Sequence, residues 1–252
     1  MKNVFHIFAR AGSLLLIALM GLQLFFFIRI TLMAWVAPES TSFERSNAYQ
    51  LATQNKLRWR QEWTDYADIS RQLKRAIIAS EDASFIDHDG VDWAAIEKAW
   101  DKNKRAEQAA EKKKPKSSAA QQPKLVKPPK TVGGSTITQQ LAKNLFLSGE
   151  RTYLRKAQEY VLVVMLETVL SKERIFEIYL NHVEWGTGVF GAEAAAQHYF
   201  KKSAKALDSY ESSMLAVMLP APKRYERVFA TSGYLQSHAA SIQMRMGGVD
   251  IP

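Results

Sequence analysis

The hydrophobic positions of this chain form one long continuous run near its start and repeat at helical spacing further on. Residues 11–28 carry no charged side chain, and residues 30–36 are apolar again. This length is close to the ~20 apolar residues that a helix needs to cross a bilayer, and Trp35 lies where an interfacial anchor is expected. We predict a transmembrane anchor over residues 11–36, preceded by a tail of residues 1–10.

A cleaved signal peptide is the alternative interpretation of this run. The apolar stretch is longer than a signal core usually is, and Trp35-Val36-Ala37 followed by Pro38 makes a poor small-residue cleavage site. Both features favour a retained anchor. Basic residues stand on both sides of the run, so charge alone does not decide its orientation.

Beyond the anchor, a polar segment over residues 37–56 is interpreted as a short linker, and helical periodicity follows it. The helices that the pattern predicts lie within residues 66–80, 91–100, 133–145, 152–170, 172–181 and 192–199. No segment shows sustained strict alternation of apolar and polar residues. The folded part, residues 57–246, is therefore predicted to be mainly α, with residues 247–252 as a tail.

Composition and charge narrow the class of protein. A chain of 252 residues with 47% hydrophobic content can build one ordinary core, and Cys 0 excludes a disulfide-stapled scaffold without fixing the compartment. Of the net charge of +9, +7 falls within residues 101–130, which have ten basic and three acidic side chains and several prolines. We expect this basic insertion to be disordered. It lacks aromatic residues for stacking on bases, so a solvated tether or a contact with anionic membrane lipid is favoured over nucleic-acid binding.

Two carboxylates stand among cations in neighbouring motifs. Glu81 opens the sequence EDASFIDHDG at residues 81–90, and Glu159 closes RKAQE at residues 155–159. A carboxylate can take the proton from an attacking sugar hydroxyl, whereas Lys and Arg can neutralise a departing phosphate. The pattern is typical of glycosyl transfer. The alternative for Arg155 and Glu159 is an ordinary surface pair at i,i+4 spacing.

The segment GGSTITQQLAKN, residues 133–144, predicts a capped helix with a polar face. Thr136 and Gln139 have the spacing of a capping box, and glycines before a helix leave N–H groups free to approach an anion. Lys143 lies within the same helix and strengthens that interpretation.

In this order the motifs resemble those of the peptidoglycan glycosyltransferases, which occur in bifunctional penicillin-binding proteins and as stand-alone enzymes. The resemblance covers about residues 57–246 and includes KERIFEIYLNHVEWGTGVFG at residues 172–191 and LPAP at residues 219–222. No serine here is followed three positions later by lysine, as the transpeptidase site of the bifunctional relatives requires. The resemblance is thus to the monofunctional biosynthetic transglycosylases.

The resemblance implies a fold, a reaction and a location. The fold would be lysozyme-like and two-lobed, and the reaction the polymerisation of lipid II into glycan strands, with inversion and release of polyprenyl diphosphate. The chain would sit in the cell inner membrane as a single-pass protein with a cytoplasmic amino terminus and a periplasmic catalytic domain. Its partners would be lipid II, the growing glycan and membrane lipid, and other cell-wall synthesis or division proteins could join it.

The resemblance also assigns roles to residues. Glu81 matches the general base, and Glu159 matches the second carboxylate, which would organise cations or a divalent ion. Asp82 and His88 would support the site, although His88 could equally be structural. The residues expected to bind substrate are Lys143, Arg155, Lys156, Thr136, Gln139, Gln140 and Asn144. No tightly bound cofactor is expected, while Mg²⁺ or Mn²⁺ could bind at the diphosphate.

Two other functions compete with glycan synthesis. A muramidase or lytic transglycosylase would share the lysozyme-like fold but would have no use for cations at a diphosphate. A non-catalytic membrane scaffold would have no need of intact Glu81 and Glu159. Tyr179, Asn181 and Trp185 are expected to pack the lobes rather than to bind a ligand.

Overall fold

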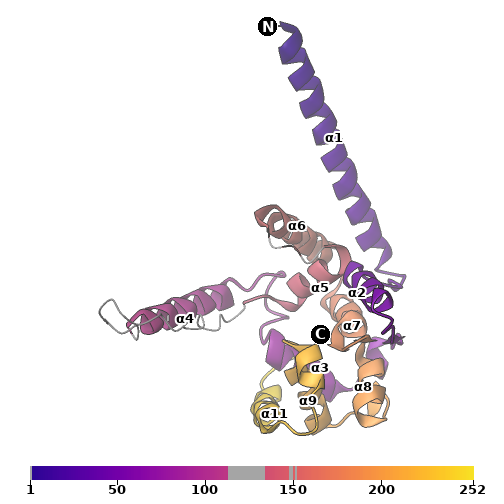
Figure 1. Cartoon of the computed structure of the whole chain (residues 1–252), viewed down its shortest axis with the longest axis vertical. Coiled ribbons are helices and arrows are strands. Elements are labelled where there is room, and N and C mark those ends of the chain that lie inside the picture. Colours follow the sequence, from indigo (N-terminus) through magenta and orange to yellow (C-terminus); the bar gives the residue numbers. More distant parts are fainter. Residues whose placement is uncertain (1, 113–133, 148–149, 151) are drawn as a thin grey trace.

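The computed structural model describes residues 2–112, 134–147, 150 and 152–252, and these form a mainly α-helical protein. The long helix α1 (Lys2–Leu32) leads into a helical body, and α4 (Trp93–Lys112) projects from one side of it (Figure 1). The other helices are α2 (Ser42–Thr53), α3 (Arg71–Glu81), α5 (Ile137–Phe146), α6 (Tyr153–Val169), α7 (Lys172–His182), α8 (Ala192–Phe200), α9 (Ser209–Met218), α10 (Pro222–Glu226), α11 (Gly233–Met246) and the 3-10 turns η1 (Tyr66–Asp68) and η2 (Ala204–Ala206). The mainly α fold class is confirmed.

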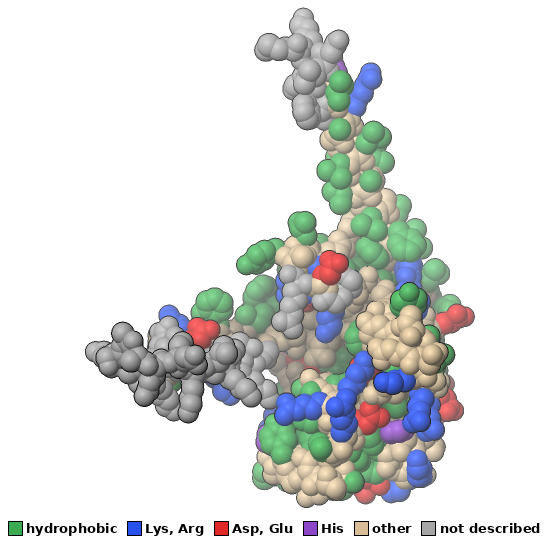
Figure 2. Space-filling view, in the orientation of Figure 1, with side chains coloured by type: hydrophobic (Ala, Val, Ile, Leu, Met, Phe, Trp, Pro, Cys, Tyr) green, Lys and Arg blue, Asp and Glu red, His purple; other side chains and the backbone are tan. Residues whose placement is uncertain are grey.

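One helix among the described residues is long and apolar enough to cross a membrane, and it is the amino-terminal one. The qualifying stretch is Ala9–Leu32, which ends four residues before the predicted boundary because the chain turns out of the helix after Leu32. Hydrophobic side chains lie along the exposed length of α1 (Figure 2). The structure thus has a long apolar helix where the apolar run predicts one.

The linker expected over residues 37–56 is wrong in part, because it contains α2. Thr41 and Glu44 form a complete capping box: the Glu44 N–H donates to Thr41 Oγ1 at 3.1 Å, and the Thr41 N–H donates to Glu44 Oε2 at 2.6 Å. Glu44 is fully buried, and its other oxygen lies 2.9 Å from His182 Nδ1. A polar composition concealed a helix whose stability comes from its cap and from packing on α5.

Disorder over residues 101–130 is also wrong in part. Residues 101–112 continue α4 as a helix, and their sequence DKNKRAEQAAEK is rich in strong helix formers. The remainder of the predicted insertion, residues 113–130, lies outside the described residues. Local helix propensity therefore outweighed the charge that suggested disorder.

A small sheet is present, although no segment of the sequence shows sustained alternation. Its strands are β1 (Arg60–Gln61), β2 (Glu184–Gly186) and β3 (Val189–Phe190), with β3 parallel to β1 and antiparallel to β2. Strands of two or three residues are too short for an alternating pattern to reveal. Gly188 allows the close approach, because its φ is +71° and a Cβ there would lie 1.8 Å from the Arg58 carbonyl oxygen.

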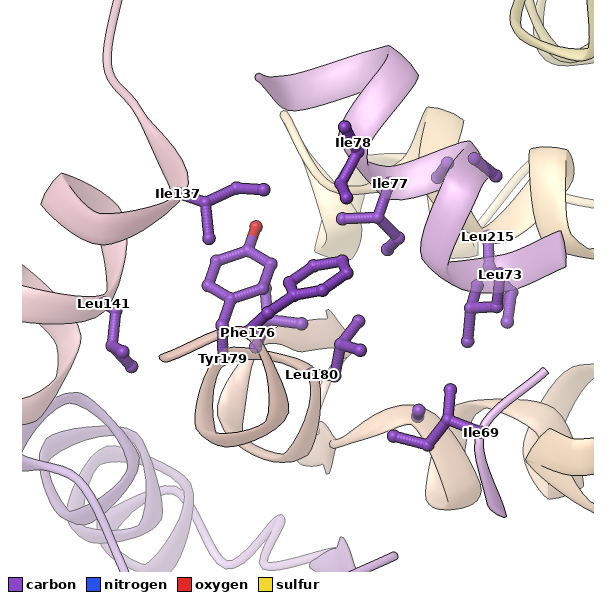
Figure 3. Close-up of a cluster of buried hydrophobic side chains, with 14 of the residues drawn as sticks. Ile69, Leu73, Ile77, Ile78, Ile137, Leu141, Phe176, Tyr179, Leu180 and Leu215 are labelled. Carbon is purple, nitrogen blue, oxygen red and sulfur yellow. The ribbon is translucent and has the colours of Figure 1, made fainter. Parts of the chain in front are cut away.

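The core is built around α7. Phe176 and Tyr179 of this helix lie between Ile137 of α5 and Ile77 of α3, and all four side chains are buried (Figure 3). On one side α5 packs against α2, α6 and α7, and on the other α3 packs against α9 and α11. These two helix groups give the two-lobed arrangement expected of a lysozyme-like fold. α3 carries Glu81 at its end, and α5 carries Gln140. Because Phe176 and Tyr179 of α7 lie between these two helices, α7 determines how the two sides of the site are placed against each other.

Candidate active site

Glu81 is the last residue of α3 and is held by the neighbouring lobe. Gln140 Nε2 on α5 donates to Glu81 Oε2 at 2.9 Å, and Ser80 Oγ lies 3.5 Å from the other oxygen. Burial raises the pKa of the Glu81 carboxyl, the hydrogen bonds from Gln140 and Ser80 lower it, and the charge of Asp82 raises it, with a net shift above the ordinary value. A carboxylate with a raised pKa is a better proton acceptor than an exposed one.

The amide that binds Glu81 is itself oriented by a buried tyrosine. Tyr179 Oη donates to Gln140 Oε1 at 3.1 Å, so the amide nitrogen of Gln140 must face Glu81. Burial raises the pKa of Tyr179 well above its ordinary value, and the charges of Glu81 and Asp82 add to this. The phenol therefore stays protonated and remains a donor. Tyr179 packs in the core as expected, yet it also supports the site, a role that no local pattern in the sequence indicates.

Asp82 joins the end of α3 to the start of α5. Its Oδ2 accepts the Ile137 N–H at 3.0 Å, and its Oδ1 lies 2.9 Å from His88 Nε2. The other ring nitrogen of His88, Nδ1, accepts the Gly90 N–H at 3.1 Å. Both nitrogens of His88 thus have protein partners, which favours a structural histidine. The supporting roles expected of Asp82 and His88 fit this geometry.

The capping box predicted at the start of α5 is confirmed. The Gln139 N–H donates to Thr136 Oγ1 at 3.1 Å, and the Thr136 N–H donates to Gln139 Oε1 at 3.2 Å. Thr136 Oγ1 also donates to the Gly90 carbonyl at 2.6 Å. The polar groups of Thr136 and Gln139 are therefore largely committed to the fold, and the Gln140 amide is bonded to Glu81 and Tyr179, which leaves Asn144 as the freer amide of this helix.

Glu159 is buried on α6 between two cations. Its Oε2 accepts Arg155 Nη1 at 2.7 Å, its Oε1 accepts Lys156 Nζ, and the residue is only 4% exposed. An ordinary surface pair would not be buried in this way. Lys143 on α5 faces the same group: desolvation lowers its pKa, Glu159 raises it, and Arg155 and Lys156 lower it, for a net decrease.

The predicted cations gather around one cavity of about 350 Å³. This cavity lies between α5 and α6. Its lining residues are Phe43, Ser135, Gln139, Gln140, Lys143, Asn144, Leu147, Glu150, Arg155, Lys156 and Glu159. Three positive side chains thus face this space, and the buried Glu159 binds two of them, Arg155 and Lys156. Such a space suits an anionic group of several oxygens, such as a diphosphate.

Glu81 lies in a second cavity, of about 530 Å³, on the other side of the start of α5. Ser135 lines both cavities, and Gln140 lines the cation cavity while it binds Glu81. The acid and the cations therefore face two halves of one cleft. Residues that the sequence did not single out also line the Glu81 half: Ser84, Asp92, Lys98, Lys102, Ser135 and Arg245. Arg245 is distant in sequence from the motifs, so nothing local marked it.

Comparison with known proteins agrees with this geometry. The family model described as transglycosylase matches residues 48–246. The match begins within α2 and so supports the inclusion of that helix in the domain.

Curated relatives match nearly the whole chain. A protein named biosynthetic peptidoglycan transglycosylase from Herminiimonas arsenicoxydans is 49% identical over 240 residues, which is 95% of this chain and 94% of the relative. Proteins of the same name from Paraburkholderia xenovorans strain LB400 and Burkholderia orbicola strain MC0-3 are 47% and 46% identical over 96% of this chain, and cover 92% and 90% of those relatives. The chain belongs to the transglycosylase family.

Proposed function

We propose that this protein polymerises lipid II into the glycan strands of peptidoglycan. One observation supports the proposal above all. Glu81 lines one cavity, Lys143, Arg155 and Lys156 line another, and Ser135 lines both. One half of the cleft offers a proton acceptor, and the other offers compensation for a departing dianion. Glycosyl transfer from a diphosphate needs both.

The reaction follows from these positions. The 4-hydroxyl of the acceptor sugar attacks the anomeric carbon of the growing chain, and Glu81 takes the hydroxyl proton as the new C–O bond forms. The bond from the anomeric carbon to the diphosphate breaks on the opposite face, which inverts the configuration. The electron pair leaves with the polyprenyl diphosphate, whose charge Lys143, Arg155 and Lys156 neutralise. Diphosphate is a weak base, so it needs cations more than a proton from a second acid.

A divalent cation at the diphosphate stays a prediction. Among the described residues, no group of three or more His, Cys, Asp or Glu side chains could hold a metal. Glu159 lies in the cation cavity, but both of its oxygens already bind Arg155 and Lys156. A metal would therefore have to take most of its oxygen ligands from the diphosphate itself.

The test is polymerisation of labelled lipid II by the detergent-solubilised full chain. We expect glycan polymer from the native protein and a loss of about 10² to 10⁴ in rate for Glu81→Gln, the usual contribution of a general base. Asp87→Asn is the matched control, because it removes an exposed carboxylate from the same motif and should leave the rate unchanged. Release of fragments from mature cell wall, without polymer from lipid II, would favour a lytic enzyme. Full activity of Glu81→Gln would favour a scaffold.

We also propose the orientation of the anchor in the inner membrane, with residues 1–10 in the cytoplasm and the helical body in the periplasm. The exposed apolar surface of Ala9–Leu32 supports the membrane location. Because the chain has no cysteine, single cysteines at Lys2 and Glu39 can report sidedness in intact cells. A membrane-impermeant maleimide should label Glu39→Cys but not Lys2→Cys, and the reverse labelling would overturn the orientation. Contacts with membrane lipid and with other cell-wall proteins remain predictions.

A further inference from the structure

The last third of α1 is docked on the helical body and is not a loose tether. Ile30 and Met33 are buried, with exposures of 0% and 4%, and belong to the main core. Phe26 packs edge-on against Phe146 at a centroid distance of 5.3 Å, and the Met33 carbonyl accepts Arg174 Nε at 2.7 Å. Phe26 and Ile30 of α1 and Met33 just after it follow helical spacing, so a single face of the helix is docked.

The docked face also carries a polar residue within the membrane-spanning stretch. Gln23 lies nine residues before Leu32, or about 13 Å along the helix axis. Gln23 Nε2 donates to Gln158 Oε1 on α6 at 2.9 Å, and Gln158 Nε2 donates back to Gln23 Oε1 at 3.1 Å. An amide in an apolar surrounding is costly unless it is paired, so this reciprocal bond favours one rotation and one depth of α6 against α1.

The outer surface of α6 fits this depth. Tyr153 and Leu154 are 96% and 85% exposed, and Val161 and Val164 are also exposed. Hydrophobic side chains lie over the outer end of α6, beside the lower part of α1 (Figures 1 and 2). The helix that bears the Gln158 amide therefore has an apolar surface suited to the same membrane layer.

Gln158 immediately precedes Glu159, and α6 also carries Arg155 and Lys156 on the cation cavity. We propose that Gln23 is a positioning residue for catalysis: its amide pair with Gln158 fixes the register of α6, and so presents the Glu159 cluster to the diphosphate. The amino-terminal helix then helps to position the residues of the active site. This inference rests on the proposed polymerase function.

The first test is a double-mutant cycle in proteoliposomes with lipid II as substrate. Gln23→Leu and Gln158→Leu should each lower kcat by roughly threefold to tenfold, the change expected from losing one hydrogen-bonded pair between helices in an apolar surrounding, and the double variant should lose no more than either single one. KM should change less than kcat, because the cations themselves remain. In the control Gln23→Leu with Leu24→Gln, the amide moves to a lipid-facing position, where Leu24 is 58% exposed, and kcat should stay low.

Several results of this cycle would overturn the inference: an unchanged kcat, effects of the two single changes that multiply in the double variant, or full rescue by the displaced amide. A native protein that makes no polymer would instead overturn the proposed function. The two failures are therefore distinguishable.

A second measurement does not depend on the variants being active. In this cysteine-free chain, Gln23→Cys with Gln158→Cys should cross-link efficiently with a short bis-thiol reagent in membranes, whereas Leu24→Cys with Gln158→Cys should not. Equal cross-linking of both pairs would show that α6 has no fixed register against α1, and would also overturn the inference.

Discussion

At the scale of single residues, the reactivity of Glu81 is set by opposing effects. Burial raises the pKa of its carboxyl, while the hydrogen bond from Gln140 lowers it. Tyr179 fixes the direction of that hydrogen bond. A lower pKa keeps Glu81 ionised, whereas a higher pKa makes its carboxylate a better proton acceptor. The native pKa lies between these two requirements.

This compromise predicts a pH effect for Gln140→Leu. Loss of the hydrogen bond removes an interaction that favours the charged form, so the pKa of Glu81 should rise further. Since the base works only when ionised, the acidic limb of the kcat/KM profile should move to higher pH. Asn144→Leu is the control, because it removes an amide from the cation cavity that has no bond to Glu81. A limb that stays in place or moves to lower pH would contradict the assignment.

Glu81→Gln should also stabilise the protein. The pKa of Glu81 is higher in the folded than in the unfolded chain, so folding is disfavoured progressively as pH rises from the ordinary carboxyl pKa through the raised value. The cost persists at neutral pH, and a neutral amide of the same shape removes it. We expect Tm to rise by a few degrees near pH 7, with a smaller gain in acid.

Thermal unfolding in one detergent at two pH values checks this prediction. The exposed Asp87→Asn should leave Tm within error at both. A fall in Tm for Glu81→Gln at pH 7 would mean that ionised Glu81 contributes to the fold, contrary to its burial.

At the scale of elements, the segment between α3 and α4 is held by a tight turn against α6. Gly90 has φ +82°, and a Cβ there would lie 2.5 Å from Val163 Cγ1 and 2.9 Å from Glu167 Cγ. Its N–H donates to His88 and its carbonyl accepts from Thr136. The turn thus connects the Glu81 motif to the start of α5.

Gly90→Ala should therefore destabilise the protein by about 2 to 5 kcal/mol, since a left-handed conformation costs alanine about 1 to 2 kcal/mol and an overpacked contact costs about 1 to 3 kcal/mol. The measurement is the free energy of unfolding from denaturant titration. Gly233→Ala is the matched control: a Cβ there meets no atom within 4 Å, and alanine in α11 should be neutral or stabilising by up to about 1 kcal/mol. Similar losses at both positions would point to a general intolerance of alanine rather than to this turn.

At the scale of the whole molecule, α1 and the helical body share one core. Ile30 and Met33 belong to the same buried cluster as Leu73 and Phe176. Removal of the anchor should therefore change the stability of the catalytic part as well as its location.

Deletion of residues 1–36 should lower the free energy of unfolding by at least about 2 kcal/mol, because burial of one aliphatic side chain contributes about 1.5 to 3 kcal/mol. The deletion of residues 1–20 is the control, since it keeps Gln23, Phe26, Ile30 and Met33 in place. Denaturant titrations of both truncations in the same detergent check this. Equal stability of the two would show that the docked segment contributes nothing.

The sequence by itself determined the features that depend on neighbours along the chain. The apolar run of α1 and the capping box of Thr136 and Gln139 are local patterns. Each involves residues close together in the chain, so it can be recognised without knowing what packs against the helix. The order of the catalytic motifs is likewise fixed along the chain. The same kind of local signal, Thr41 with Glu44, marks α2 within the supposed linker, although the polar composition there suggested otherwise.

Only the tertiary structure decided which distant groups meet. Glu81 and Gln140 are 59 positions apart, and Gln23 and Gln158 are 135 apart, so no periodicity in the chain can report their bonds. The short strands, the second role of Tyr179 and the place of Arg245 in the cleft depend in the same way on packing between elements that are distant in sequence. Local patterns define helices, but a pKa, a cavity and a docked anchor arise from side chains that only the folded chain brings within a few ångströms.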